Sequence, residues 1–133
     1  MAILYTDGAS KGNPGPAGVG VYLKWRTKKG DWQERKYSKP LGNKTNNVAE
    51  YEALIYGLEK ANQLKIKRIK CFSDSQLMVR QLNGIYRLKN SDVIKNFVKI
   101  WNLKISFDEI EFNYIPREEN NIADGLAKKA SQN

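Results

Sequence analysis

Four acidic side chains occur where the sequence passes from one expected secondary-structure element to the next: Asp7, Glu50, Asp74 and Asp124. Asp7 and Asp74 end stretches that have the composition of β-strands, whereas Glu50 and Asp124 fall near the starts of expected helices. Each one alone has an ordinary structural explanation, as a turn residue, a helix cap or a charge that suits the helix dipole. Together they suggest a site, because α/β sheets bind ligands at the carboxyl ends of their strands.

The chemistry of these four side chains limits which metal they can hold. Carboxylates that converge repel one another unless a cation neutralises them. The chain has no histidine and only one cysteine, so oxygen ligands remain, and these select hard cations such as Mg²⁺ or Mn²⁺. Two such ions about 3.5–4 Å apart can cleave a phosphodiester, because one activates the attacking water and the other stabilises the leaving 3′-oxygen.

The charge of the chain points to the same class of substrate. The formal net charge is +9 and the isoelectric point is near 9.6. A basic surface attracts polyanions, and nucleic acid is the leading candidate partner. A purely solubilising role for the excess charge stays open at this point, because net charge alone carries no information about a site.

Length and hydropathy predict one domain that covers residues 1–133 and buries a core of its own. No apolar run approaches the ~20 residues that a transmembrane helix needs, and no secretory signal is visible, so we expect no membrane association. Cys71 is the single cysteine, which excludes an internal disulfide. We interpret Cys71 as a small buried side chain and expect a reducing, cytoplasmic location.

Hydrophobic periodicity predicts five strands and four helices. The expected strands cover residues 2–7, 18–26, 32–41, 67–74 and 107–115. The expected helices cover residues 46–64, 75–82, 91–103 and 122–130. Three leading strands followed by a β-α-β segment imply an α/β fold, in which helices pack on the faces of a mixed sheet.

The helix at residues 46–64 is expected to direct Glu50 toward the sheet. Asn47 suits the N-cap position, and Glu50 three residues later would complete a capping box, which is the structural explanation of this glutamate. A helical projection also places Glu50 in a row with Gly57 and Ala61, whose small size lets the helix approach the sheet. The corresponding cap candidates for the helices at 75–82 and 122–130 are Asp74 and Asn121.

Two further segments have open interpretations. The loop at residues 8–17 is rich in glycine and proline, so its backbone amides can approach a ligand closely. Residues 24–44 hold eight basic side chains against two acidic ones, and they form either a rim that faces phosphates or an edge strand protected by lysines. For the tryptophans we expect packing in preference to stacking on a substrate; they are Trp25, Trp32 and Trp101.

Four sequence blocks, in order along nearly the whole chain, resemble the ribonuclease H family of the type 1 kind. The blocks are Asp7-Gly8-Ala9-Ser10-Lys11-Gly12-Asn13-Pro14-Gly15-Pro16, Thr45-Asn46-Asn47-Val48-Ala49-Glu50, Ser73-Asp74-Ser75-Gln76 and Ile122-Ala123-Asp124-Gly125-Leu126-Ala127. Each block alone is moderately specific, and the four in this order make a strong signal.

The resemblance implies a five-stranded mixed sheet flanked by helices. It also implies an endonuclease that hydrolyses the RNA strand of RNA–DNA hybrids with two Mg²⁺ or Mn²⁺ ions and leaves 5′-phosphate and 3′-hydroxyl ends. The family's catalytic and metal-binding carboxylates map onto Asp7, Glu50, Asp74 and Asp124. Its contacts with the hybrid map onto Gly8, Ser10, Asn13, Thr45, Asn46, Asn47 and Gln76. Such short polar groups suit recognition of 2′-hydroxyls, which distinguish RNA from DNA. For Asn46 and Asn47, helix capping alone remains the alternative.

The sequence departs from the family pattern in two places. Many members carry a histidine before the last helix, where this chain has Arg117 as the nearest substitute. Arg117 stays protonated and so cannot act as a base, but it can bind a phosphate; the alternative is a surface arginine beside Glu118 and Glu119. Many members also insert a basic protrusion where this chain has a short link at residues 84–90. Its basic residues are Arg87 and Lys89.

Two alternative functions remain beside an active nuclease that works alone. One is the ribonuclease H domain of a reverse transcriptase, and the other is a non-catalytic module that binds hybrids. The start at Met1 and the single-domain length favour a stand-alone enzyme, which we expect to be a monomer. The presence of all four carboxylates favours catalysis over mere binding. Duplex RNA is a further candidate substrate.

Overall fold

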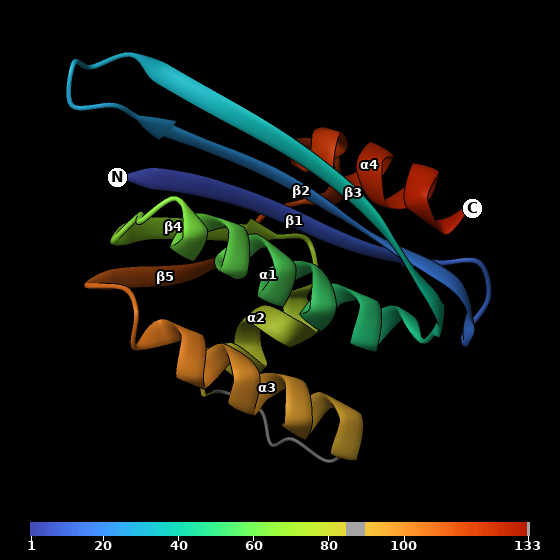
Figure 1. The fold of residues 1–133 in the computed structure, drawn as a ribbon. Coiled ribbons are helices and arrows are strands. Elements are labelled where there is room, and N and C mark those ends of the chain that lie inside the picture. Colours follow the sequence, from blue (N-terminus) through green and yellow to red (C-terminus); the bar gives the residue numbers. More distant parts are fainter. Residues whose placement is uncertain (85–89, 133) are drawn as a thin grey trace.

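The computed structural model describes residues 1–84 and 90–132, and a five-stranded mixed sheet forms its centre (Figure 1). The strand order is β3-β2-β1-β4-β5. Strands β1, β2 and β3 pair antiparallel, whereas β4 pairs parallel with both β1 and β5. The strands are β1 (Ala2–Ser10), β2 (Gly15–Arg26), β3 (Trp32–Lys44), β4 (Arg68–Ser73) and β5 (Glu109–Tyr114).

Helices cover both faces of this sheet. The helix α1 packs on β1 and β2, α3 packs on α1, and α4 lies across β1, β2 and β3 on the other face (Figure 1). The helices are α1 (Asn46–Gln63), α2 (Gln76–Leu82), α3 (Ser91–Lys104) and α4 (Asn121–Ser131), with a 3₁₀ turn, η1 (Arg117–Glu119), before α4. The expected α/β architecture and the expected order of elements are confirmed.

The hydrophobic core lies between the sheet and helix α1. Leu4 and Leu23 from the sheet meet Leu54 and Leu58 from α1, and all four side chains are buried. Burial of one such side chain contributes about 1.5–3 kcal/mol to folding. Cys71 is also buried in this cluster, as expected.

The first two strands are longer than expected. Asp7 does not end β1, which continues to Ser10, and β2 already begins at Gly15. The expected loop at residues 8–17 therefore shrinks to residues 11–14. The cause is tertiary pairing, which overrides the turn propensity of the glycines and prolines: β1 stays paired with β2 as far as Ser10 and Ala17. A register shift beside Ala17 accommodates the irregular segment.

The residues that cap the helices also differ from the expected ones, which were wrong by one or two positions. Thr45, not Asn47, caps α1, because its Oγ1 accepts the backbone N–H of Val48. Ser75, not Asp74, caps α2. Asn120 occupies the N-cap position of α4 in place of Asn121, without a capping side-chain hydrogen bond. Since the true caps are hydroxyls or a neighbouring asparagine, the carboxylates Glu50 and Asp74 are left for other roles.

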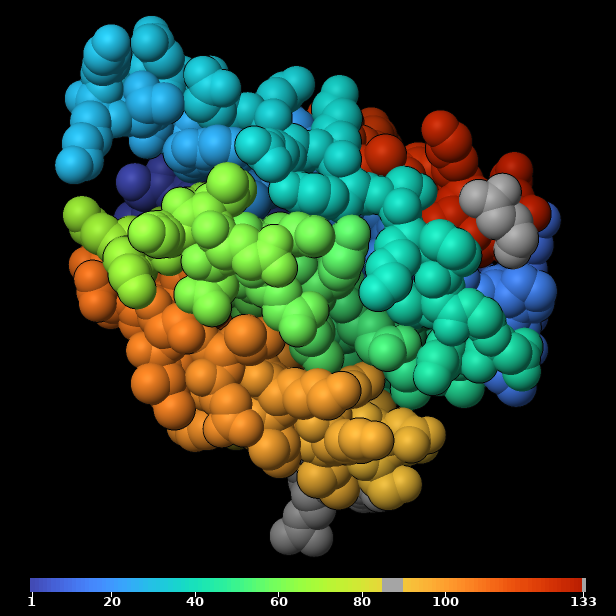
Figure 2. Space-filling model, in the orientation of Figure 1, coloured from blue at the N-terminus to red at the C-terminus, as the bar shows by residue number. Residues whose placement is uncertain are grey.

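The turn end of the β2–β3 hairpin projects from the molecule, whereas the other end of β3 leads into α1. Figure 2 shows this hairpin projecting at the upper left, with α1 in green between β3 and α3. Strand β3 is an edge strand, and its lysines fit the role of protecting a sheet edge. The expected packing of the tryptophans in the core or the hairpin is confirmed for Trp25, which is half-buried against the core, and for Trp32, which is exposed but lies within the hairpin with its ring centroid 5.6 Å from Lys24 Nζ. Trp101 is exposed on α3, where its ring stacks on that of Phe97.

The basic residues of the link at 84–90, Arg87 and Lys89, lie outside the described residues. Among the described helices, none combines the length and the apolar character that crossing a bilayer requires.

Candidate active site

The sheet brings Asp7 and Asp74 together because two parallel strands separate at this point. Strands β1 and β4 pair as far as Thr6 and Ser73. The residue that follows on each strand is an aspartate, so the Asp7 and Asp74 carboxylates occupy equivalent positions just beyond the Thr6–Ser73 pair. Asp7 is 4% exposed, and the Asp74 side chain is 5% exposed.

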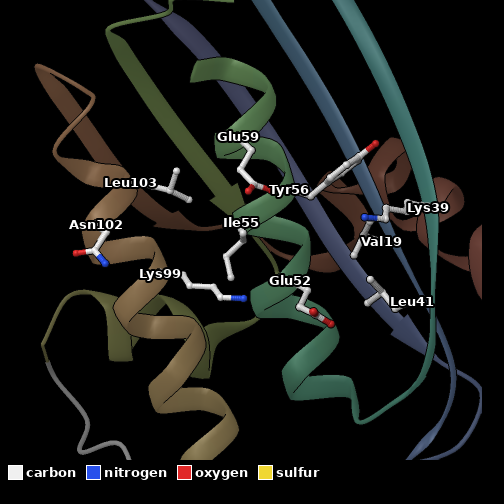
Figure 3. Close-up of a pocket in the computed structure, with 10 residues that line it drawn as sticks. All are labelled: Val19, Lys39, Leu41, Glu52, Ile55, Tyr56, Glu59, Lys99, Asn102 and Leu103. Carbon is white, nitrogen blue, oxygen red and sulfur yellow. The ribbon is translucent and has the colours of Figure 1, made fainter. Parts of the chain in front are cut away.

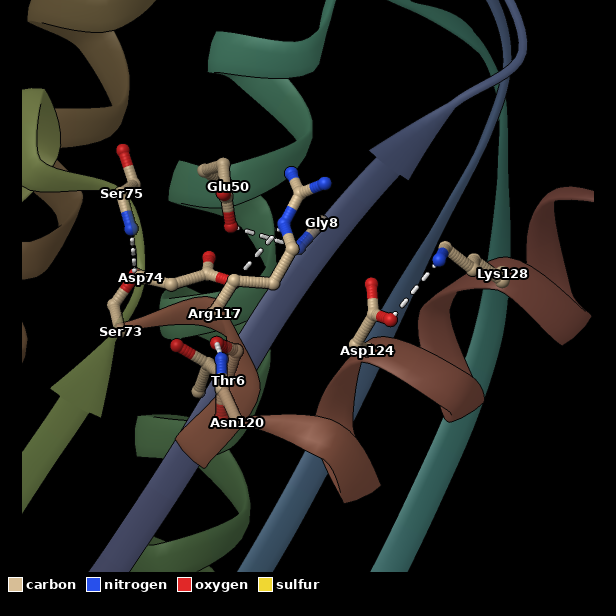
Figure 4. Close-up of polar contacts among 10 residues, drawn as sticks. All are labelled: Thr6, Gly8, Glu50, Ser73, Asp74, Ser75, Arg117, Asn120, Asp124 and Lys128. Carbon is tan, nitrogen blue, oxygen red and sulfur yellow. Dashed lines mark hydrogen bonds and ion pairs between the residues drawn. The ribbon is translucent and has the colours of Figure 1, made fainter. Parts of the chain in front are cut away.

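Helix α1 contributes Glu50 through a close approach to β1. The backbone N–H of Gly8 donates to Glu50 Oε1 at 2.8 Å. A Cβ atom at residue 8 would lie 2.2 Å from the carbonyl carbon of Ala49, so only glycine permits this approach. Glu50 is therefore not the partner in a capping box. Its carboxylate points at the strand ends, as the helical projection indicated (Figure 4).

Asp7, Glu50 and Asp74 form one cluster, in which one carboxylate oxygen from each lies within 4.8 Å of the others. Burial raises the pKa of Asp7, and the charges of Glu50 and Asp74 raise it further. Burial likewise raises the pKa of Glu50, although the Gly8 amide opposes this effect. Asp7 and Glu50 thus bind protons more readily than isolated carboxylates do, because burial and neighbouring negative charge both disfavour the ionised form.

Asp124 comes from α4, which reaches the sheet through another glycine. A Cβ atom at Gly20 would lie 2.1 Å from the carbonyl oxygen of Ala123. The carboxylate of Asp124 pairs with Lys128 Nζ at 3.1 Å (Figure 4). Burial acts to raise the pKa of Asp124, but Lys128 lowers it on balance. Asp124 is outside the group of three oxygens, yet its charge still contributes to the raised pKa of Asp7.

Arg117 lies beside the cluster, where the sequence placed the substitute for the family's histidine. Its Nε is 3.8 Å from Asp74 Oδ2, and its side chain is 77% exposed. Burial raises the pKa of Asp74, and the Arg117 guanidinium acts against that rise. Arg117 is thus a long, exposed cation at the mouth of the site, suited to an anionic ligand.

The donor set fits hard divalent cations. All four side chains are carboxylates, the ligands that Mg²⁺ and Mn²⁺ prefer. Asp74 Oδ2 is buried and accepts no hydrogen bond from residues 1–84 and 90–132, so a ligand position is available inside the cluster. Asp7, Glu50 and Asp74 converge directly, and Asp124 stands next to them with its charge balanced by Lys128.

The residues expected to contact nucleic acid lie on β1, on the loop after it and at the starts of α1 and α2. Asn13 Oδ1 accepts the backbone N–H of Asn46 at 3.0 Å and so fixes the loop at 11–14 to the start of α1. Asn13 and Asn46 are exposed, and Thr45 is half-buried as the α1 cap. Capping is therefore the role of Thr45 and not of Asn46.

The other expected contact residues have varied environments. Gly8 uses its N–H for Glu50, and the Ser10 hydroxyl donates within the chain, with the Lys44 carbonyl as one acceptor at 2.8 Å. Asn47 is half-buried at the start of α1. Gln76 is exposed at the first position of α2, two residues after Asp74. Asn13, Asn46 and Gln76 are consequently the most available side chains of this set.

A separate groove lies between β3, α1 and α3 (Figure 3). Its lining mixes lysines and glutamates, among them Lys39, Glu52 and Lys99, over an apolar floor. None of the expected site residues lines it. The carboxylate cluster is thus distinct from this groove.

Sequence reasoning missed two residues at the site. Lys128, the partner of Asp124, has a sequence signal, because residues four apart on a helix face each other. Asn120 has no sequence signal of this kind beyond its position before a helix. Its buried Nδ2 donates to the backbone oxygen of Thr6, and only the fold brings these two residues together.

Comparison with known proteins connects this geometry to a family. A family model described as reverse transcriptase-like matches residues 5–130. The bifunctional protein Rv2228c of Mycobacterium tuberculosis is 38% identical over 96% of this chain, and a ribonuclease HI of Halobacterium salinarum is 39% identical over 95%. The chain spans 35% of the length of the first relative and 62% of the second.

Two solved structures share the fold over nearly their whole length. The RNase H1 of Halobacterium salinarum superposes with a TM-score of 0.90 at 37% identity, covering 98% of this chain and 97% of that one. LC11-RNase H1, solved in complex with an RNA/DNA hybrid, superposes with a TM-score of 0.88 at 39% identity, covering 99% and 97%.

Proposed function

The chain belongs to the ribonuclease H family, and we propose that it is an endonuclease that hydrolyses the RNA strand of RNA–DNA hybrids. The proposed reaction uses two divalent ions, Mg²⁺ or Mn²⁺, and leaves 5′-phosphate and 3′-hydroxyl ends. The observation that carries the proposal is the convergence of Asp7, Glu50 and Asp74, with Asp124 beside them.

The four carboxylates would hold the ions, and the environment of each carboxylate suits it to a different part of the site. Asp7 is central, because it borders both Glu50 and Asp74 and its pKa responds to Asp124 as well. Asp74 offers the buried Oδ2, which accepts no hydrogen bond from the described part of the chain. Divalent ions bound there would supply an activated water and neutralise charge on the phosphate and on the leaving oxygen. Gly8 and Lys128 keep Glu50 and Asp124 in place.

The hybrid would be held by polar groups around the carboxylates. Asn13, Asn46 and Gln76 are exposed on three different segments, so they are available to the 2′-hydroxyls and minor-groove edges of a bound hybrid. Gly8, Ser10, Thr45 and Asn47 would contribute mainly by shaping this surface. Arg117 would bind the phosphate next to the cluster, since its long side chain is exposed and always charged.

We also propose that residues 1–133 act as a single domain, as a monomer and in the cytoplasm, where Cys71 stays reduced. The domain of a reverse transcriptase and the non-catalytic hybrid-binding module are the alternatives. Duplex RNA is the further substrate to test.

The test is cleavage of a labelled RNA–DNA hybrid, with duplex RNA, duplex DNA and single strands in parallel, in Mg²⁺, in Mn²⁺ and with chelator. We expect cleavage of the hybrid's RNA strand that needs metal and that Asp7→Asn abolishes while hybrid binding persists. Failure of the parent chain to cut in either metal, with binding retained, would support the non-catalytic module. Cleavage by Asp7→Asn near the parent rate would refute the role of Asp7.

A further inference from the structure

We propose that Asn120 is a positioning residue that keeps the segment carrying Arg117 and Asp124 in register with the strand that carries Asp7. This inference deepens the proposed function and rests on it, because the register matters for how the four carboxylates hold divalent cations. The sequence pattern gives no role to Asn120 beyond its position just before the last helix.

The side chain of Asn120 joins two distant parts of the chain. It is only 2% exposed, and its Nδ2 donates to the backbone oxygen of Thr6 at 2.9 Å. Thr6 is the last residue of β1 that pairs with β4, and it directly precedes Asp7. The hydrogen bond therefore acts on the backbone at the point where the cluster begins (Figure 4).

The backbone of Asn120 connects to the two functional groups on its own side. Its N–H donates to the carbonyl of Arg117 at 2.9 Å, and its carbonyl accepts the N–H of Asp124 at 3.0 Å. The same residue thus closes η1 and opens α4. Any shift of Asn120 relative to Thr6 moves both Arg117 and Asp124 relative to Asp7.

The geometry differs from what helix stability alone would favour. An asparagine at an N-cap normally accepts a hydrogen bond from the second or third helical amide. Asn120 occupies the N-cap of α4 but makes no such bond, and its Oδ1 is buried with no hydrogen-bond partner among the described residues. The same holds for Thr6 Oγ1 within the part of the chain that the structure describes. The Asn120 side chain therefore does not cap α4, and its Oδ1 acceptor is left without a hydrogen bond from the described residues. It makes the hydrogen bond to the Thr6 backbone in β1 instead.

This link has a direct consequence for metal binding. Asp124 is the one carboxylate outside the group of oxygens that lie within 4.8 Å of one another, so its distance from Asp7 depends on how α4 sits on the sheet. Groups that orient metal ligands from behind typically change metal affinity or activity about 10–100-fold when they are removed. We place Asn120 in this class.

The test compares Asn120→Ala and Asn120→Asp with two matched controls. Neither variant can donate to Thr6 in the same way, and the second keeps the shape of the side chain. Thr6→Val removes the unpartnered hydroxyl and leaves the backbone acceptor, and Asn121→Ala changes an exposed neighbour. Each protein is examined for Mn²⁺ affinity by calorimetry without substrate, for kcat and KM on the hybrid, and for its melting temperature.

We expect the Asn120 variants to bind Mn²⁺ about 10-fold more weakly and to lose roughly 10–100-fold in kcat, with KM within about 2-fold of the parent. Both controls should match the parent. A lower melting temperature with unchanged Mn²⁺ affinity and kcat would show a merely structural role and overturn the proposal. An equal loss in Thr6→Val would overturn it too. If the parent binds Mn²⁺ but cuts no hybrid, the proposed function fails, and the calorimetric comparison still decides the role of Asn120.

Discussion

Gly8 donates its backbone N–H to Glu50 Oε1 at 2.8 Å, and this contact fixes the start of helix α1 against strand β1. The space between the two elements admits no side chain at residue 8, because a Cβ would lie 2.2 Å from the Ala49 carbonyl carbon and 2.4 Å from the Glu50 nitrogen. The glycine is therefore required for packing and, through the same contact, for the position of the Glu50 carboxylate, which we propose to be catalytic.

Gly8→Ala should destabilise the protein and inactivate it together. Overpacking against backbone atoms costs about 1–3 kcal/mol, and displacement of Glu50 should lower kcat on the hybrid by ~10-fold or more. Thermal unfolding and hybrid cleavage measure the two effects. The matched control is Gly125→Ala, since a Cβ there meets no atom of the described residues within 4 Å. That change should stabilise α4 by ~0.5–1 kcal/mol and leave cleavage intact. Parent-like stability and activity in Gly8→Ala would contradict the packing argument.

Much of this site could be predicted from the sequence, because the relevant signals are local. Asp74 follows a β-strand and Asp124 begins a helix, and both features depend on a few neighbouring residues. The projection of the first helix correctly placed Glu50 toward the sheet above Gly57, where a Cβ would lie 2.9 Å from Leu4. These signals were sufficient for the α/β fold and for the gathering of the carboxylates.

The remaining features depend on tertiary pairing, which no local pattern reveals. The extension of β1 to Ser10 occurs because β2 continues alongside it, despite residues that usually form turns. Thr45 and not Asn47 caps α1 because of where β3 ends and the helix begins, which is set by the pairing of β3 with β2. The contact of Asn120 with Thr6 spans 114 positions of sequence, so only the folded chain shows it.

The raised pKa values of the cluster predict a pH-dependent stability that metal should remove. Burial and mutual repulsion raise the pKa values of Asp7, Glu50 and Asp74 above their values in the unfolded chain. The native state then binds more protons than the unfolded state, so the stability of the metal-free protein falls as pH rises above the ordinary carboxyl values near ~4. Mn²⁺ should restore stability at neutral pH, because it binds the ionised cluster.

Asp7→Asn tests this directly, because an amide replaces the buried carboxyl group whose raised pKa obliges the native state to take up a proton at neutral pH. Without that cost of about 1–2 kcal/mol, the melting temperature of the metal-free protein should rise by ~3–8 °C at neutral pH. The difference should vanish near pH 4, and Mn²⁺ should no longer stabilise the variant. Asp108→Asn, at an exposed position, is the control and should change little. A lower melting temperature for Asp7→Asn at neutral pH would show that this proton uptake does not limit the stability of the metal-free protein.

Arg117 should have opposite effects on metal binding and on turnover. Its Nε lies 3.8 Å from Asp74 Oδ2, where it would compete with the proposed divalent cation for the same oxygen. Arg117→Ala should therefore lower the Mg²⁺ concentration needed for half-maximal activity by ~2–5-fold, since a like charge near the cluster is removed. The same variant should lose about 10-fold in kcat if Arg117 binds the phosphate, and Arg117→Lys should recover part of that loss. An unchanged kcat in Arg117→Ala would show that Arg117 is a surface arginine with no role in turnover.

The salt dependence of hybrid affinity should reveal which part of the basic hairpin contacts phosphate. Lys44 ends β3 beside Thr45, whereas Lys28 lies in the turn at the opposite end of the hairpin (Figure 1). Affinity for the hybrid should fall at least ~10-fold between about 50 and 200 mM salt, and each phosphate contact adds roughly 0.9 to the logarithmic slope. Lys44→Gln should reduce that slope by ~0.9, because Lys44 adjoins the site, and Lys28→Gln should leave it unchanged. A reduced slope in Lys28→Gln would instead extend the phosphate-facing rim to the far end of the hairpin, and equal slopes in all three proteins would assign the lysines of β3 to protection of the sheet edge.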